Sequence, residues 1–188
     1  DGVNVDGSTV QGGLTNFGTI TAGSSLTSSG FDGIDISDST FNGGIHNAHY
    51  AEILARDTGI TISSDTVFTG GIANAGLIAS TSLNGGIGHG VHIGSGVSFS
   101  GGIENTFNGE IRGGANGTSN HAIDIDADLF SGNITNDGLI KGQGFVGDGI
   151  NITGAEFDGS IINDDHGKII VSGTMGAAIY VGEIGRAH

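Results

Sequence analysis

Three aspartates that alternate with apolar residues, at Asp124, Asp126 and Asp128, are the best acidic cluster in the chain. Side chains at alternate positions of an extended strand point to the same face, so these carboxylates are expected together on the outer face of one strand. A row of carboxylate oxygens suits calcium. The spacing of an EF-hand and the Gly-Gly-x-Gly-x-Asp pattern of calcium-binding β-rolls are both missing. The sequence therefore offers Asp124, Asp126 and Asp128 as calcium ligands, with a solvated acidic face as the alternative; Asp35 and Asp38 form a thinner version.

Histidines are the second group that could do chemistry. His46 and His49, and likewise His89 and His92, lie three residues apart, a spacing that places the two side chains on opposite faces of a strand or turn. This argues against a transition-metal site at either pair.

The outward residues between the apolar pairs of successive repeats place His92 beside Asp124, and this pair resembles the acid–base pairs of β-helix enzymes that cleave polysaccharides. Arg112 is the one nearby basic residue that could grip an acidic sugar. A Gly-Asp-Ser-Gly nucleophile motif is absent and no serine is flanked by a base. We therefore predict no catalytic residues, no bound cofactor other than the calcium considered above, and no enzymatic activity.

These residues are placed by a repeat with the pattern (Phe/Val)-x-Gly-x-(Ile/Leu)-x-Asn. Every copy follows an apolar-x-apolar pair such as Val91 and Ile93, and an isoleucine such as Ile111 closes it; successive pairs are 26 to 32 residues apart. The six copies are Val10–Asn16, Phe41–Asn47, Phe68–Asn74, Phe99–Asn105, Phe130–Asn136 and Phe157–Asn163. Fixed landmarks on such a period indicate a solenoid.

The local pattern decides between helices and strands. Apolar residues recur with a period of two, β-branched residues dominate the paired positions, and Gly and Asn interrupt each run after four to eight residues. Residues 1–188 are therefore predicted to form a single all-β segment, a right-handed parallel β-helix of about six coils with three short strands per coil. The handedness follows from the general rule for parallel crossovers.

In a β-helix, equivalent residues stack in columns about 4.8 Å apart. One column is expected in the core, and the glycine two residues after each aromatic ring either leaves room for the ring or bends the strand. The core column is Val10, Phe41, Phe68, Phe99, Phe130 and Phe157.

A second column consists of asparagines. Asparagine tolerates a left-handed turn conformation, and its amide can also donate and accept hydrogen bonds along the axis. We favour both roles together. The column is Asn16, Asn47, Asn74, Asn105, Asn136 and Asn163.

The turn after this asparagine has two lengths that alternate from coil to coil. The next isoleucine comes four residues after Asn16, Asn74 and Asn136, but six residues after the other three. A difference of two preserves the inward direction of that isoleucine. Separately, Leu83–Ile87 imitates the motif between two true copies, which leaves the local register open.

Composition excludes several classes of partner. The net charge is −15, with 20 acidic and five basic residues, so nucleic-acid binding is not expected. The chain lacks cysteine, which excludes disulfides and thiolate metal sites. No apolar run approaches the roughly 20 residues that span a bilayer, so this segment is not expected to insert into a membrane.

The sequence Phe68-Thr-Gly-Gly-Ile-Ala-Asn-Ala-Gly-Leu-Ile78 resembles the repeats of autotransporter passenger domains and related bacterial surface adhesins. The resemblance covers essentially the whole chain. It implies an extracellular or cell-surface scaffold, an interior piece of a longer passenger or filament, whose partner is a glycan or protein receptor or further copies of itself. A carbohydrate-binding or carbohydrate-cleaving β-helix and a filament of stacked coils remain the alternatives.

Overall fold

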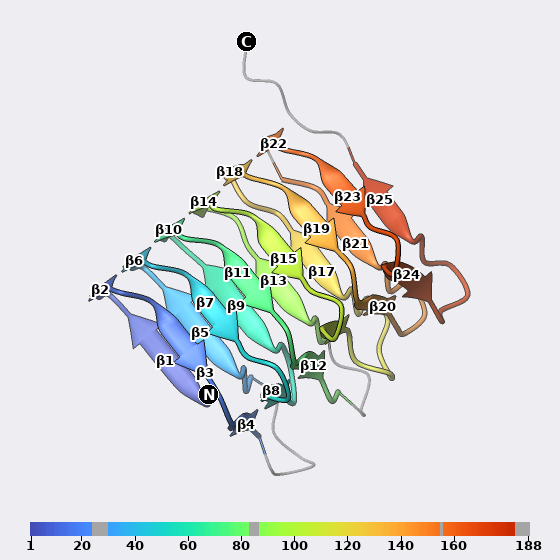
Figure 1. Cartoon of the computed structure of the whole chain (residues 1–188), viewed down its shortest axis with the longest axis horizontal. Helices are drawn as coiled ribbons and strands as arrows, with labels where there is room; N and C mark the ends of the chain where they lie inside the picture. Colours follow the sequence, from blue (N-terminus) through green and yellow to red (C-terminus); the bar gives the residue numbers. More distant parts are fainter. Residues whose placement is uncertain (24–29, 83–86, 155, 183–188) are drawn as a thin grey trace.

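The computed structural model of the chain describes residues 1–23, 30–82, 87–154 and 156–182. These residues form 25 short strands in four parallel sheets, which we name A to D in the order in which the chain enters them. Strands of one sheet lie side by side along the long axis, from the blue end of the chain to the red end (Figure 1). The predicted all-β parallel β-helix is confirmed.

Sheets A and B hold the first two strands of each coil. Sheet A contains β1 (Val3–Asp6), β5 (Ile34–Ser37), β9 (Ile60–Ser63), β13 (Val91–Ile93), β17 (Ile123–Ile125), β21 (Ile150–Ile152) and β25 (Ile179–Val181). Sheet B contains β2 (Thr9–Gln11), β6 (Thr40–Asn42), β10 (Val67–Thr69), β14 (Ser98–Ser100), β18 (Leu129–Ser131) and β22 (Phe157–Asp158).

Sheets C and D complete each coil. Sheet C contains β3 (Leu14–Asn16), β7 (Ile45–Asn47), β11 (Ile72–Asn74), β15 (Ile103–Asn105), β19 (Ile134–Asn136) and β23 (Ile161–Asn163). Sheet D contains β4 (Thr19–Ala22), β8 (Glu52–Ala55), β12 (Leu77–Ser80), β16 (Glu110–Arg112), β20 (Leu139–Gly142) and β24 (Lys168–Val171).

Equivalent residues of the repeat pair directly between coils. Phe68 of β10 pairs with Phe99 of β14, so no extra coil intervenes at the imitation motif. Residues 83–86 of that imitation motif lie outside the described residues. Ile78 likewise pairs with Ile53 across the two turn lengths, and both side chains are fully buried. The difference of two residues between long and short turns therefore preserves the inward direction of these isoleucines, as predicted.

Each of the six full coils has four strands rather than the expected three, because one predicted strand is divided between sheets B and C. In the first four coils the division falls at a pair of glycines with positive φ. Between β10 and β11, Gly70 has φ 100° and Gly71 has φ 71°, a conformation that favours glycine. A Cβ atom on Gly71 would lie 2.6 Å from the carbonyl oxygen of Gly101 in the next coil. The glycines thus bend the strand and let backbones stack closely, and the space is filled by backbone rather than by a phenylalanine ring.

The core column of aromatic rings is present. Phe41, Phe68, Phe99, Phe130 and Phe157 stack with ring centroids 4.9 to 5.2 Å apart and interplanar angles of 2° to 11°. Val10 pairs with Phe41 at the first coil. Isoleucines from sheets A, C and D supply most of the rest of the core; they are almost completely buried in the inner coils and partly buried at Ile20, Ile161 and Ile169.

The asparagine ladder is also present. Each Nδ2 donates to the Oδ1 of the next asparagine, at 2.8 to 2.9 Å through all five steps from Asn16 to Asn163. The proposed left-handed turn role is wrong. Among the described residues, the non-glycine positions with positive φ are Asp38, Tyr50 and Ser64, and each ladder asparagine instead closes a strand of sheet C.

Candidate functional site

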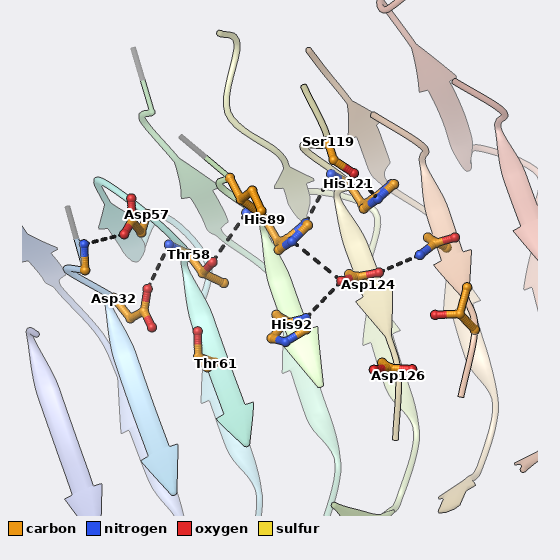
Figure 2. Close-up of a pocket in the computed structure, with 14 residues that line it drawn as sticks. Asp32, Asp57, Thr58, Thr61, His89, His92, Ser119, His121, Asp124 and Asp126 are labelled. Carbon is orange, nitrogen blue, oxygen red and sulfur yellow. Dashed lines mark hydrogen bonds and ion pairs between the residues drawn. The ribbon is translucent and has the colours of Figure 1, made fainter. Parts of the chain in front are cut away.

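A groove of about 550 Å³ lies along the outer side of sheet A, lined by 14 described residues (Figure 2). In each sheet A strand, one outward residue lies between two inward apolar residues. These outward residues pair directly with one another from strand to strand and so form a column. That column is Asn4, Asp35, Thr61, His92, Asp124, Asn151 and Tyr180. Its central members, Thr61 to Asn151, reach into the groove.

A second side-chain ladder, which sequence reasoning missed, runs just before sheet A. The residue two positions before each strand's first apolar residue accepts a hydrogen bond from the backbone N–H of its equivalent in the next coil. The acceptors are Asp1 (3.0 Å), Asp32 (2.9 Å), Thr58 (3.4 Å), His89 (3.2 Å), His121 (2.9 Å) and Asp148 (2.5 Å). The residue type varies, but every side chain offers an acceptor atom.

This ladder fixes the tautomer of His89. Nδ1 of His89 accepts from the backbone N–H of His121, and Nδ1 of His121 accepts from that of Asp148. The proton of the neutral His89 ring is therefore on Nε2. In His121, Nε2 lies 2.9 Å from Ser119 Oγ, and Nδ1 lies 3.2 Å from the carboxylate oxygen Oδ2 of Asp148 as well as close to its backbone N–H.

Asp124 is the centre of the polar cluster (Figure 2). Its Oδ2 lies 2.9 Å from His92 Nδ1 and 3.5 Å from His89 Nε2, and its Oδ1 accepts from Asn151 Nδ2 at 2.6 Å. Because His92 donates through Nδ1, its other ring nitrogen, Nε2, carries the free lone pair. The His92 side chain is 29% exposed, whereas that of Asp124 is only 12% exposed.

Burial and hydrogen bonding act in opposite directions on Asp124 and His89. Burial alone would raise the pKa of the Asp124 carboxyl, but donors from His92 and Asn151 and the neighbouring His89 lower it to about 2. Burial lowers the pKa of His89 to about 4, although Asp124 opposes that shift. Near pH 7 the cluster therefore holds a carboxylate beside a neutral His89.

The arrangement supports two kinds of chemistry. A carboxylate that orients a histidine, whose other nitrogen faces a groove, is the geometry of a general base. The same pair also resembles a metal-ligating histidine with its carboxylate partner. The predicted proximity of His92 and Asp124 is thus observed. A polysaccharide-cleaving site would also need a cation to hold an acidic sugar, and no lysine or arginine occurs among the described residues that line the groove.

The predicted row of three aspartates is not formed. Strand β17 ends at Ile125, so Asp124 alone lies on the strand, where histidines and Asn151 surround it. Asp126 and Asp128 are exposed, and Asp128 accepts a hydrogen bond from the backbone N–H of Gly96. In the described part of the chain, these three carboxylates do not converge as metal ligands. Asp35, in β5, has its pKa raised by burial and by Asp32 and Asp6.

The expectation that His89 and His92 lie on opposite faces is wrong. Strand β13 begins at Val91, so His89 belongs to the preceding turn, and the strand period does not apply to it. The two ring centroids are 5.3 Å apart and both rings reach Asp124. The other pair differs: His46 is exposed on β7, and His49 lies in the next turn against Tyr50, with ring centroids 3.7 Å apart.

Arg112 is not among the residues that line the groove. It is on β16 of sheet D, where its Nη1 lies 3.4 Å from Glu110 Oε1.

Sequence reasoning also missed His121 and Asp148. The signal that could have found them is the acceptor residue that precedes Gly or Ala before each sheet A strand, as in His121-Ala-Ile and Asp148-Gly-Ile.

A second surface follows the turns between sheets C and D. Phe17, Tyr50 and Phe107 belong to these turns and are 80%, 86% and 58% exposed. The ring of Phe107 also meets His166, two coils further, at 4.9 Å edge to face. A smaller groove of about 300 Å³ lies over the short turn at Ala75, between the long turns that carry Tyr50 and Asn108. We call Phe17, Tyr50 and Phe107 the aromatic ridge.

Comparison with models of known protein families, with curated proteins and with solved structures found no match for this chain. In the described residues there is no helix with the length and apolar character needed to cross a membrane.

Acidification is expected to destabilise the protein through His89. The folded pKa of about 4 lies below the unfolded value of about 6.5, so protons bind the unfolded state first as the pH falls. Stability should be intact above pH 6.5 and fall by roughly 2–3 kcal/mol between pH 7 and 4. Urea unfolding in EDTA-containing buffers at several pH values measures this loss.

His89→Asn is the informative variant for this pH dependence. Asparagine keeps an acceptor oxygen for the backbone N–H of His121 but does not titrate. We expect a flatter pH profile in this variant, while His46→Asn on the exposed face of β7 keeps the wild-type slope. Equal slopes in wild type and His89→Asn would refute the assignment.

Proposed function

We propose that this chain is a rigid, non-catalytic β-solenoid segment of an extracellular or cell-surface protein, and that it presents an adhesive surface. The observation that carries this proposal is the continuity of the two repeat columns. The asparagine ladder runs through all six coils, and the phenylalanines stack through five of them with Val10 in the first, so the repeated residues are used for cohesion. What varies from coil to coil is the set of turns and outward side chains, which is where a scaffold would carry its contacts.

The aromatic ridge is the surface we assign to adhesion. Phe17 and Tyr50 are 80% and 86% exposed, and aromatic side chains of this kind supply a large apolar contact area when a partner covers them. Aromatic faces stack on the C–H faces of sugars and also act as anchors in protein interfaces. The partner we propose is therefore a surface glycan or a protein receptor.

The extracellular location rests on the resemblance of the repeat to passenger domains and surface adhesins. The acidic surface agrees with a soluble, displayed segment, since a net charge of −15 opposes nonspecific association. A filament of stacked copies is the second candidate.

The aromatic ridge can be tested by replacing Phe17, Tyr50 and Phe107 together with alanine. Loss of exposed anchors should weaken binding to glycan arrays or cell surfaces at least tenfold, because aromatic hot spots carry a large share of interface energy. Phe145→Ala is the matched control, since Phe145 is 54% exposed and lies outside the ridge, after β20.

Undiminished binding by the triple variant would contradict the ridge as the adhesive surface. Sedimentation velocity on the same samples separates the filament candidate, because stacked copies would sediment as large species whether or not the ridge is intact.

A further inference from the structure

The strongest unassigned feature is the convergence of three potential metal ligands in the sheet A groove. We propose that His89, His92 and Asp124 form a binding site for a divalent transition-metal ion. The site lies in the groove beside sheet A, whereas the aromatic ridge lies on the turns between sheets C and D. The proposal therefore goes beyond the scaffold function and does not depend on it.

The ligand atoms are already close to the separation that a metal requires. Each pair among the three ligand atoms is within 4.8 Å. His92 Nδ1 and His89 Nε2 both face one oxygen, Asp124 Oδ2, at 2.9 and 3.5 Å. Bonds of about 2.0–2.2 Å in a tetrahedral zinc site place ligand atoms roughly 3.3–3.6 Å apart. Small side-chain movements would therefore open room for the ion.

The surrounding contacts favour monodentate binding by Asp124. Its second oxygen, Oδ1, is held by Asn151 Nδ2 at 2.6 Å, which leaves Oδ2 for the ion. Hydrogen bonds of this kind orient the side chains that bind the metal directly, and they raise metal affinity. The ring of His89 stacks on that of His121 with centroids 5.3 Å apart and an angle of 4°, which limits its rotation. The remaining coordination positions would face the groove and take water or a ligand.

The proton balance of binding is defined by the tautomers. Both rings are neutral when they bind, and each must present a lone pair to the ion. His92 moves its proton from Nδ1 to Nε2, which faces the groove. His89 moves its proton from Nε2 to Nδ1. Nδ1 then carries a hydrogen and can no longer accept the hydrogen bond from the backbone N–H of His121, 3.2 Å away, so this bond breaks. The amide of His121 is therefore a built-in reporter of metal binding.

The chemistry of the donors selects the class of ion. Two imidazoles and one carboxylate with open positions suit zinc, cobalt or ferrous iron, whereas calcium prefers oxygen ligands alone. Asp32, Asp57 and Asp126 also line the groove, and none of its described lining residues is lysine or arginine. This negative surface raises the local concentration of cations.

The test is titration of the intact, metal-stripped protein with zinc chloride by calorimetry, and with cobalt chloride by visible absorption. We expect one ion per chain and a cobalt spectrum of low coordination number. His92→Gln and Asp124→Asn should each weaken binding at least 100-fold. His166→Gln is the matched control, because His166 forms an exposed pair with Asp137 at 3.0 Å and should leave binding unchanged.

His92→Gln keeps the test decisive if Asp124→Asn does not fold, since His92 is partly exposed and removal of its ring leaves the core intact. Amide NMR adds an independent readout: zinc should shift the His121 resonance in wild type and not in His92→Gln. The proposal is overturned if wild type binds zinc no better than His92→Gln, if His166→Gln abolishes binding, or if calcium competes with zinc at equal concentration.

Discussion

Replacement of Phe99 by alanine is expected to lower the free energy of unfolding by about 3–5 kcal/mol. Phe99 is fully buried, and its ring stacks on Phe68 and Phe130 with both centroid distances at 4.9 Å. Alanine would remove both contacts and leave a cavity. The cavity cannot close along the axis, because backbone hydrogen bonds on all sides of the coil fix the spacing between coils. Urea unfolding followed by circular dichroism measures the loss.

Phe157→Ala is the matched control for this prediction. Phe157 occupies the same column, is only partly buried and, among the described residues, stacks on Phe130 alone. Its replacement should therefore cost clearly less than that of Phe99. If the two variants lost equal stability, the stability of the solenoid would not reside in the continuous aromatic stack.

The sequence was sufficient to predict the fold because the same core and ladder positions recur in every coil. Phe and Asn recur in fixed register, and in a parallel stack a fixed register means direct contact between equivalents. The column positions of Phe99 and Asn105 follow from this alone. The fourth strand of a coil could not be read from the period of two, because in the first four coils the split depends on the positive φ of a glycine pair such as Gly70 and Gly71.

The candidate site was less accessible to sequence reasoning because it is made from residues that do not repeat. His92 and Asp124 could be placed side by side from the column of outward residues. The position of His89 could not, since it belongs to a turn that precedes β13 and has no strand period. The ladder that holds His89 and His121 conserves an acceptor atom through Asp, Thr and His, so no single residue type marks it.

The asparagine ladder makes a second large prediction: Asn105→Asp should destabilise the protein by roughly 3–5 kcal/mol near pH 7. The Nδ2 of Asn105 donates to Asn136 Oδ1 at 2.8 Å and lies 3.1 and 3.3 Å from the carbonyl oxygens of Gly109 and Leu139. A carboxylate oxygen in this position would face three acceptors without a donor. Asn105→Ala, which removes the amide without adding charge, should cost less, about 1–3 kcal/mol.

The pH dependence of Asn105→Asp separates the ladder from a turn preference. Asp and Asn have nearly the same shape and both are common in turns, so a purely conformational role would make the substitution mild at every pH. In the ladder, burial raises the pKa of the new carboxyl above the unfolded value of about 3.9, and the folded state then binds the proton first. The deficit relative to wild type should therefore shrink as the pH falls from 7 towards 4, which paired urea titrations would reveal. A deficit that is small, or constant over this range, would mean that the amide hydrogen bonds between coils contribute little to the stability of the solenoid.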